Sequence, residues 1–136
     1  IIGDEVNFSA RIEGLTKQYG VYCLIGENTH QAIKDLPHLV TRELDDVMVK
    51  GKIEPRRIYE LLTSEITETK KLVLEHFAAG RAAYCAGDFK VAIDAFTSAL
   101  AQDSKDGPSQ VFLDRSVALL ENPPENWTGV FEFKTS

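Results

Sequence analysis

Hydrophobic positions in the first part of the chain follow the periods of helices and strands in turn. Between residues 6 and 19, apolar side chains recur every three or four positions and predict one buried helix face: Phe8, Ile12, Leu15 and Tyr19. Asp4 is suited to begin this helix and Gly20 to end it. The continuous apolar run of residues 21–25 predicts a buried strand immediately afterwards.

Weaker patterns continue this alternation up to residue 62. Residues 27–33 predict a short helix that ends before Pro37. Residues 40–49 alternate only loosely, and they predict an exposed edge strand because several of them are charged: Arg42, Glu43, Asp45 and Asp46. After a turn at Gly51, residues 57–62 predict the last strand of this part.

The remainder of the chain has the helical period. Amphipathic stretches are separated by breaks that contain glycine: residues 65–86, 89–102 and 108–120. A Pro-Pro pair ends the third stretch and leaves an irregular tail with the only tryptophan, Trp127. The sequence therefore predicts an α+β protein in two parts, with mixed elements in residues 1–63 and an all-helical extension in residues 64–136.

Composition argues against two kinds of partner. No segment approaches the roughly 20 apolar residues of a membrane-spanning helix, and no cleavable leader is recognisable, so we expect no membrane contact by this segment. The net charge of −6 disfavours nucleic acid, because neutralising a duplex requires a basic surface. A pocket for a single phosphate is still compatible with this net charge. Since the chain begins with Ile1 and its only methionine is Met48, we expect a piece of a longer protein.

Cysteines and histidines give no ligand pattern. Cys23 and Cys85 are too few and too far apart for a disulfide framework, and their apolar neighbours predict buried free thiols. The histidines have no ligand spacing with one another: His30, His38 and His76. We expect no metal site within this chain.

Asn7 and Arg11 are the residues of the first predicted helix that suggest chemistry. Four positions apart, they project from nearly the same side and flank the apolar face. An amide and a guanidinium side by side near a helix start suit an anionic, oxygen-rich ligand. On spacing alone, two ordinary surface residues remain the commoner interpretation of such a pair.

The residues around this pair match a longer pattern. Residues 3–7, Gly-Asp-Glu-Val-Asn, and residues 10–16, Ala-Arg-Ile-Glu-Gly-Leu-Thr, closely resemble the catalytic-helix signature of class III adenylate and guanylate cyclases. Asn7 and Arg11 occupy the positions that in this family orient the ribose and stabilise the pentavalent phosphate during ring closure. The resemblance therefore implies a catalytic role for both.

A second block resembles the end of the same domain. It comprises Arg-Glu-Leu-Asp at residues 42–45, Val-Met-Val-Lys-Gly-Lys at residues 47–52 and Ile-Tyr-Glu-Leu at residues 58–61. The resemblance implies that Lys50 contacts the substrate triphosphate. A lysine beside a glycine turn offers a mobile charge and open backbone amides, which fits this role. We expect Lys52 to be an ordinary surface lysine.

The resemblance implies the C-terminal part of a ferredoxin-like cyclase domain. Its parent would be a phosphorus–oxygen lyase that converts ATP, or GTP as the less favoured substrate, to the 3′,5′-cyclic monophosphate and pyrophosphate in intracellular signalling. It would use Mg²⁺ or Mn²⁺, whose ligands belong to the upstream half and not to this chain. Because the family's site forms between two cyclase domains, we expect a homodimer or higher oligomer and a fragment that is inactive alone. We further expect a bacterial, cytoplasmic protein, with an upstream membrane anchor left open.

The helical part resembles a single tetratricopeptide-like unit. The likeness rests on residues at the spacings of that repeat: Gly80, Gly87-Asp88-Phe89, Ala92-Ile93, Phe96, Ala99-Leu100 and Asp103. One repeat cannot bury its faces alone, so we expect it to pack on the first part or on another copy. The alternative to an enzyme is a non-catalytic dimerisation or partner-docking module derived from a cyclase.

Overall fold

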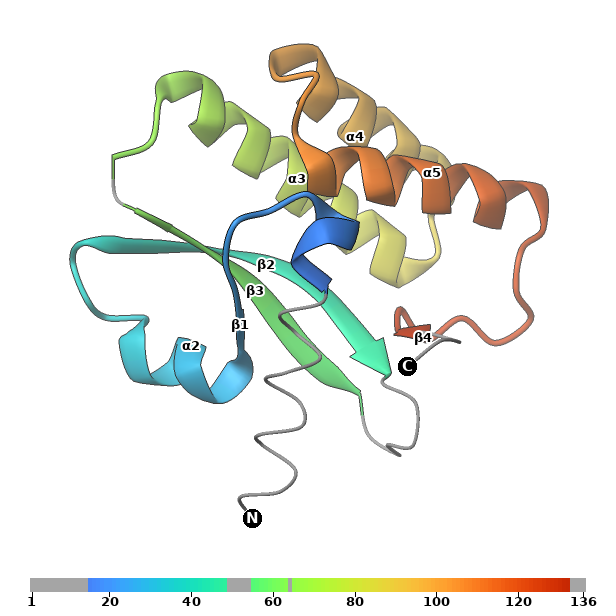
Figure 1. Cartoon of the computed structure of the whole chain (residues 1–136). Coiled ribbons are helices and arrows are strands. Elements are labelled where there is room, and N and C mark those ends of the chain that lie inside the picture. Colours follow the sequence, from blue (N-terminus) through green and yellow to red (C-terminus); the bar gives the residue numbers. More distant parts are fainter. Residues whose placement is uncertain (1–14, 49–54, 64, 133–136) are drawn as a thin grey trace. The chain divides into compact units, whose positions relative to one another are not determined.

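The structure, a computed structural model, describes residues 15–48, 55–63 and 65–132 of the chain (Figure 1). The chain divides into two compact units. The first, here called the sheet unit, contains residues 1–65 and 130–136, and the second, the helical unit, contains residues 66–129. The described residues combine helices with a mainly antiparallel sheet, which agrees with the predicted α+β class.

The sheet unit includes the end of the first predicted helix. Residues 15–19 are helical, and both Leu15 and Tyr19 are buried as the periodicity predicted. Gly20 ends the helix in the left-handed conformation with φ of 70°, where a side chain would be strained. Its amide donates to the carbonyl of Thr16 at 2.9 Å. The predicted stop is therefore confirmed.

The predicted strand of residues 21–25 is shorter and lies later than expected. Strand β1 spans Leu24–Gly26, and of its residues Leu24 is buried. Tyr22 is fully exposed, so the continuous apolar run was wrongly interpreted as one buried strand. Helix α2 follows directly and spans Glu27–Ile33, as predicted.

Strands β2 and β3 form the longest ladder of the sheet. β2 spans Leu39–Met48 and β3 spans Arg56–Thr63, and they pair antiparallel. The strand order is β1-β3-β2-β4, and β4 is a short strand, Phe131–Glu132, that pairs parallel to the end of β2. The sequence did not predict β4, because two residues are too few to give a period. The tail thus returns to the sheet unit after the helices.

The prediction that β2 exposes its charged residues was wrong at two positions. Arg42 and Asp45 are both buried, whereas Glu43 is exposed. Arg42 is buried because it pairs with Glu60 directly across the ladder, and Asp45 because a β-bulge turns it inward. Charge alone was therefore a poor guide to which side of this strand faces solvent.

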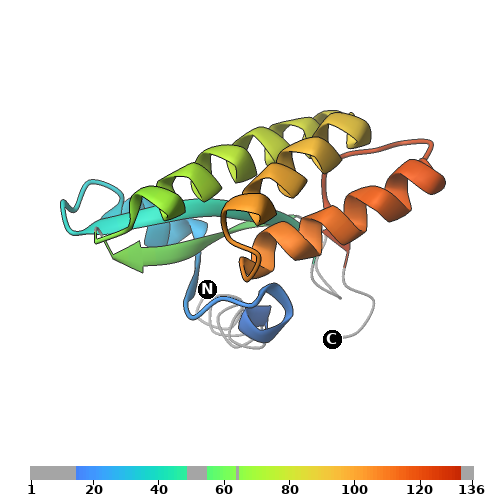
Figure 2. The same ribbon diagram turned by 90° about the horizontal axis from the view of Figure 1, so that it is seen from above.

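The helical unit contains three helices at nearly the predicted positions. Helix α3 spans Glu68–Ala86, α4 spans Phe89–Gln102 and α5 spans Gly107–Glu121. Side chains of Thr67, Asp88 and Asp106 cap the three N-termini by accepting backbone amides. Gly87 ends α3 with φ of 84°, and α4 turns back alongside α3, as Figures 1 and 2 both show.

Aromatic rings fill the core of this unit. Phe77, Phe96 and Phe112, one from each helix, lie with centroids 5.4–5.5 Å apart. Trp127 in the tail packs edge-on against Tyr84 and Phe89, and its indole donates to the carbonyl of Tyr84. Trp127 therefore serves packing within this unit.

Neither cysteine is part of a disulfide, but the expectation that both are buried was wrong. Cys23 is half-buried and Cys85 is exposed. Apolar neighbours in the sequence do not guarantee burial on a helix, where positions one apart point in different directions. The Cys85 sulfur accepts from the guanidinium of Arg81 at 3.0 Å.

Candidate functional site

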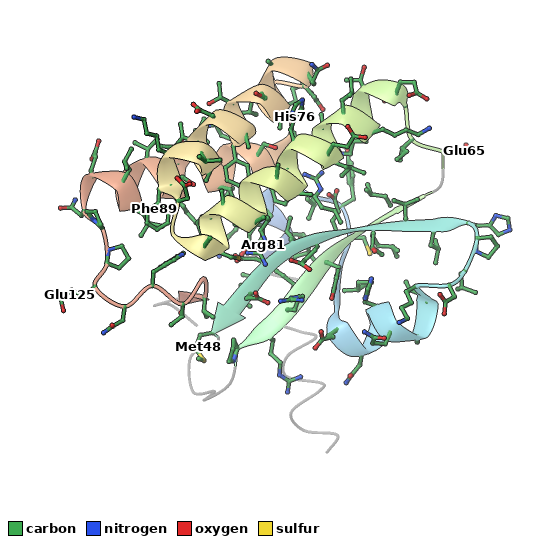
Figure 3. The ribbon with its side chains drawn as sticks, turned by 180° about the vertical axis from the view of Figure 1, so that it is seen from behind. Met48, Glu65, His76, Arg81, Phe89 and Glu125 are labelled. Atoms are coloured by element: carbon green, nitrogen blue, oxygen red, sulfur yellow. The ribbon has the colours of Figure 1, made fainter. Side chains whose placement is uncertain are left out.

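The three residues predicted to carry the chemistry, Asn7, Arg11 and Lys50, lie outside the described residues. The structure describes the elements that adjoin them. Arg11 precedes the helical residues 15–19, and Lys50 follows the end of β2 at Met48, which Figure 3 labels. The described residues 15–48 and 55–63, which adjoin these positions, are here called the framework of the candidate site.

A buried hydrogen bond joins the helix end to β2. The Tyr19 hydroxyl donates to Oδ2 of Asp45 at 2.5 Å, and neither residue is accessible to solvent. Oδ1 of Asp45 accepts the backbone amide of Asp46 at 2.9 Å. Both carboxylate oxygens thus have a donor, which offsets the cost of burying this group. The bond ties the segment after Arg11 to the strand before Lys50.

A β-bulge places Asp45 at this contact. Glu43 pairs with Tyr59 and Asp45 pairs with Ile58, so Leu44 is an extra residue in β2. In a regular strand, Leu44 and Asp45 would point to opposite faces of the sheet. At the bulge both are fully buried, and the carboxylate reaches Tyr19.

A buried ion pair joins β2 to β3. Arg42 and Glu60 are directly opposite in the register, and Nη2 of Arg42 lies 2.7 Å from Oε1 of Glu60. Their side chains are 3% and 7% exposed. Attraction between the two charges compensates for lost hydration only while both partners are present. We assign this pair the role of fixing the β2–β3 register.

The other face of the ladder carries a partly exposed charge network. Nε of Arg57 lies 2.9 Å from Oδ1 of Asp46, and Nη1 lies 3.4 Å from Glu43. The hydrogen bond to Asp46 is the main reason why the pKa of Arg57 is raised above its ordinary value. These contacts join β2 to β3 next to the segment that contains Lys50.

Helix α2 contributes a stacked ring pair to this face. The rings of His30 and Tyr59 are nearly parallel, with centroids 3.8 Å apart. Burial disfavours the phenolate and raises the pKa of Tyr59, while Arg57 opposes this shift. Among the described residues, this stack fixes α2 to the sheet.

The described residues do not fit a metal centre. In the parts of the chain that the structure describes, no three histidine, cysteine, aspartate or glutamate side chains gather in a metal-binding arrangement. The carboxylate of Asp45 is engaged with Tyr19 and Asp46, which leaves it unsuited to a cation. Nor is any helix within the described ranges long and apolar enough to cross a bilayer.

Comparison with known proteins relates the chain to adenylate cyclases. It is 30% identical over 124 residues to the terminal-differentiation-specific adenylate cyclase of Dictyostelium discoideum, a match that covers 88% of this chain. It is 47% identical over 62 residues to the adenylate cyclase of Anabaena cylindrica, which covers 45% of this chain. The cyclase resemblance noted in the sequence is therefore supported by curated relatives.

These relatives are much longer than the chain. The matched regions span 6% of the Dictyostelium protein and 12% of the Anabaena protein. At 88% coverage, the Dictyostelium match runs through most of the sheet unit and most of the helical unit. No family model matches the chain, and no solved structure matches it.

Sequence reasoning missed both buried polar pairs of the framework. Tyr19 was predicted as one apolar position of a helix face, and its hydroxyl was given no partner. Asp45 was predicted among the charges of an exposed edge strand, and the buried position of Glu60 was not predicted. A signal was present in the register, because Arg42 and Glu60 are opposite charges on adjacent predicted strands. The bulge that redirects Asp45 gave no comparable signal.

Proposed function

We propose that this chain is the C-terminal part of a class III adenylate cyclase, whose parent converts ATP to 3′,5′-cyclic AMP and pyrophosphate. The observation that carries the proposal is the 47% identity over 62 residues to a protein named adenylate cyclase. A match of that strength extends well beyond one short motif. ATP is preferred over GTP because both curated relatives are named for it.

Three residues of this chain would act on the substrate. Asn7 orients the ribose, and Arg11 places a fixed cation beside the phosphorus where negative charge develops as the ring closes. Lys50 holds the triphosphate as a mobile point charge. Interactions that strengthen only in the transition state raise kcat, whereas contacts to the whole triphosphate lower KM.

The described framework supports this assignment of roles. The Tyr19–Asp45 hydrogen bond connects the helical segment after Arg11 with the strand before Lys50. The Arg42–Glu60 pair fixes the register of that strand against β3. A site assembled from two separate segments needs such connections, because misplacement by about 1 Å can cost about 100-fold in rate.

The proposed parent uses Mg²⁺ or Mn²⁺ held by residues outside this chain. When bound, the metal supplies charge neutralisation for the phosphates and activation of the ribose 3′-hydroxyl. This chain alone is then inactive, and the site is completed by an upstream half and a second cyclase domain. The parent is proposed to be a cytoplasmic, bacterial homodimer or higher oligomer.

We propose a tetratricopeptide-like character for the helical unit. Its first two helices form a hairpin, and the ring of Phe96 lies where a side chain on Gly80 would be, which explains a small residue at that repeat position. Three aromatic residues, one per helix, then form a shared core. Continuation of the Dictyostelium match into this unit supports treating it as part of the cyclase.

A cyclase assay tests the activity. The chain is expressed alone and joined to the half that precedes it in its gene, and cyclic AMP formation from ATP with Mn²⁺ is measured for both. We expect product only from the joined protein. Two folded but inactive preparations would instead favour the alternative, a non-catalytic dimerisation or docking module.

Two lysines of the same segment provide a matched test of substrate binding. Lys50→Ala in the joined protein is expected to raise the KM for ATP by about 10-fold or more, since a charge-assisted hydrogen bond contributes about 1.5–3 kcal/mol. Lys52→Ala removes the same charge two positions away and is expected to leave KM within about twofold. Equal effects of the two substitutions would refute the specific role of Lys50.

A further inference from the structure

The Tyr19–Asp45 hydrogen bond stands at the junction of the two segments that carry the proposed site residues. Tyr19 is the last residue of the helical segment, and Asp45 lies three positions before the end of β2. Both residues are fully buried, and their oxygens are 2.5 Å apart. Among the described residues, this hydrogen bond connects the helix end to the β2–β3 ladder.

We propose that Tyr19 and Asp45 are positioning residues for the cyclase reaction. Their hydrogen bond fixes the helix predicted to carry Asn7 and Arg11 against the strand that leads to Lys50. Neither residue touches the substrate, and both act through the placement of others. The inference rests on the proposed function and adds to it two residues that the cyclase resemblance did not provide.

Helix geometry explains why a contact at Tyr19 would control Arg11. If the predicted helix is continuous, Arg11 lies eight positions before Tyr19, which corresponds to about 12 Å along its axis. A tilt of about 10° at the Tyr19 end would then move Arg11 by about 2 Å. On the other side of the contact, five residues of chain lead from Asp45 to Lys50. A small movement at the hydrogen bond therefore becomes a larger displacement of the site residues. A displacement of about 1 Å there can lower the rate about 100-fold.

The chemistry of the pair favours positioning over simple packing. Burying a carboxylate costs free energy that an apolar side chain of the same size would not, so stability alone does not explain Asp45. The β-bulge adds one residue, Leu44, to β2 and thereby directs this carboxylate toward the helix. A directional bond holds the helix at one angle, which apolar packing would not do by itself.

The neighbouring Asp46 offers a matched control. It is also an aspartate of β2 and also accepts from a side chain, because Arg57 donates to both of its oxygens at 2.9 and 3.4 Å. These side-chain hydrogen bonds join β2 to β3. Asp46→Asn therefore removes a comparable charge one residue away without changing the hydrogen bond to the helix.

The experiment uses the joined protein and measures kcat and KM for ATP, with the folded fraction determined by circular dichroism. Tyr19→Phe and Asp45→Asn are each expected to lower kcat about 10-fold while KM stays within about twofold. The double variant is expected to lose about 10-fold as well, because both substitutions break one bond. Asp46→Asn is expected to keep kcat within about twofold.

Each outcome separates the inference from the proposed function. An active wild type whose Tyr19→Phe and Asp45→Asn variants keep full kcat per folded protein would overturn the inference alone, since the bond would then serve stability only. A double variant that loses the product of the two single effects would also overturn it. An inactive wild-type protein would overturn the proposed function and this inference with it.

Discussion

The interiors of the two units are built from different chemistry. In the sheet unit, charged and polar partners are buried in specific pairs, Arg42 with Glu60 and Tyr19 with Asp45. In the helical unit, the helices meet through aromatic rings, with Phe77, Phe96 and Phe112 in mutual contact. Polar pairs fix register and angle, whereas rings supply buried area with less directional demand. The helical unit also buries a polar pair, Asp106 with Ser109, but this pair lies at the start of one helix, whereas the pairs of the sheet unit join separate elements.

Breaking the Arg42–Glu60 pair is expected to have the largest effect on stability. Arg42→Met leaves the Glu60 carboxylate buried without its cation and should cost about 3–5 kcal/mol. Hydrogen exchange of the amides in β2 and β3 measures this cost locally. Combining Arg42→Met with Glu60→Leu is expected to restore most of the loss, since an apolar pair needs no counter-charge. A double variant as unstable as the single one would contradict this account.

Crowding the helical core is expected to have the next largest effect. A side-chain carbon on Gly80 would lie 2.5–2.8 Å from three ring atoms of Phe96, which is itself fully buried. Helix propensity favours Gly80→Ala by about 1 kcal/mol, but overpacking should outweigh it and give a net loss of about 1–3 kcal/mol. Because the only tryptophan packs in this unit, Trp127 fluorescence reports its unfolding in urea. An increase in stability would show that the ring can move aside.

Alkaline pH is expected to have the smallest effect. The folded pKa of Tyr59 is raised, chiefly by burial, so the unfolded chain loses this proton first and stability falls as pH rises above about 10. Tyr59→Phe should remove that part of the loss while keeping the ring that stacks on His30. Urea midpoints at pH 8 and pH 11 measure the difference. Tyr22→Phe serves as control because Tyr22 is fully exposed, and a similar change in both variants would contradict the prediction.

The same contrast explains which features could be predicted from the sequence. Helices α2 and α4 begin and end at the predicted residues, because periodicity, glycine breaks and N-caps are all local signals. The stop at Gly20 was predictable for the same reason. In the sheet unit, the burial of Arg42 and Asp45 depends on partners far along the chain. Such pairings are set by register and by a bulge, neither of which a single strand pattern specifies.

The residues of the candidate site likewise include some that the sequence predicted and others that only the fold revealed. Asn7, Arg11 and Lys50 were predicted from motifs, and the curated relatives support the cyclase relation behind those motifs. Tyr19 and Asp45 were found only when the fold brought residues 26 positions apart into contact. Strand β4, formed by the tail after the helices, was likewise invisible to pattern analysis.

The central claim is that the first predicted helix carries residues that stabilise the cyclisation transition state. The most direct measurement is kcat for cyclic AMP formation by the joined protein with Arg11→Ala and, separately, Asn7→Ala. Removal of one such donor is expected to lower kcat by about 100- to 1,000-fold, with the protein still folded. Variants that retain wild-type kcat would contradict the account, because the chain would then lack the catalytic residues assigned to it.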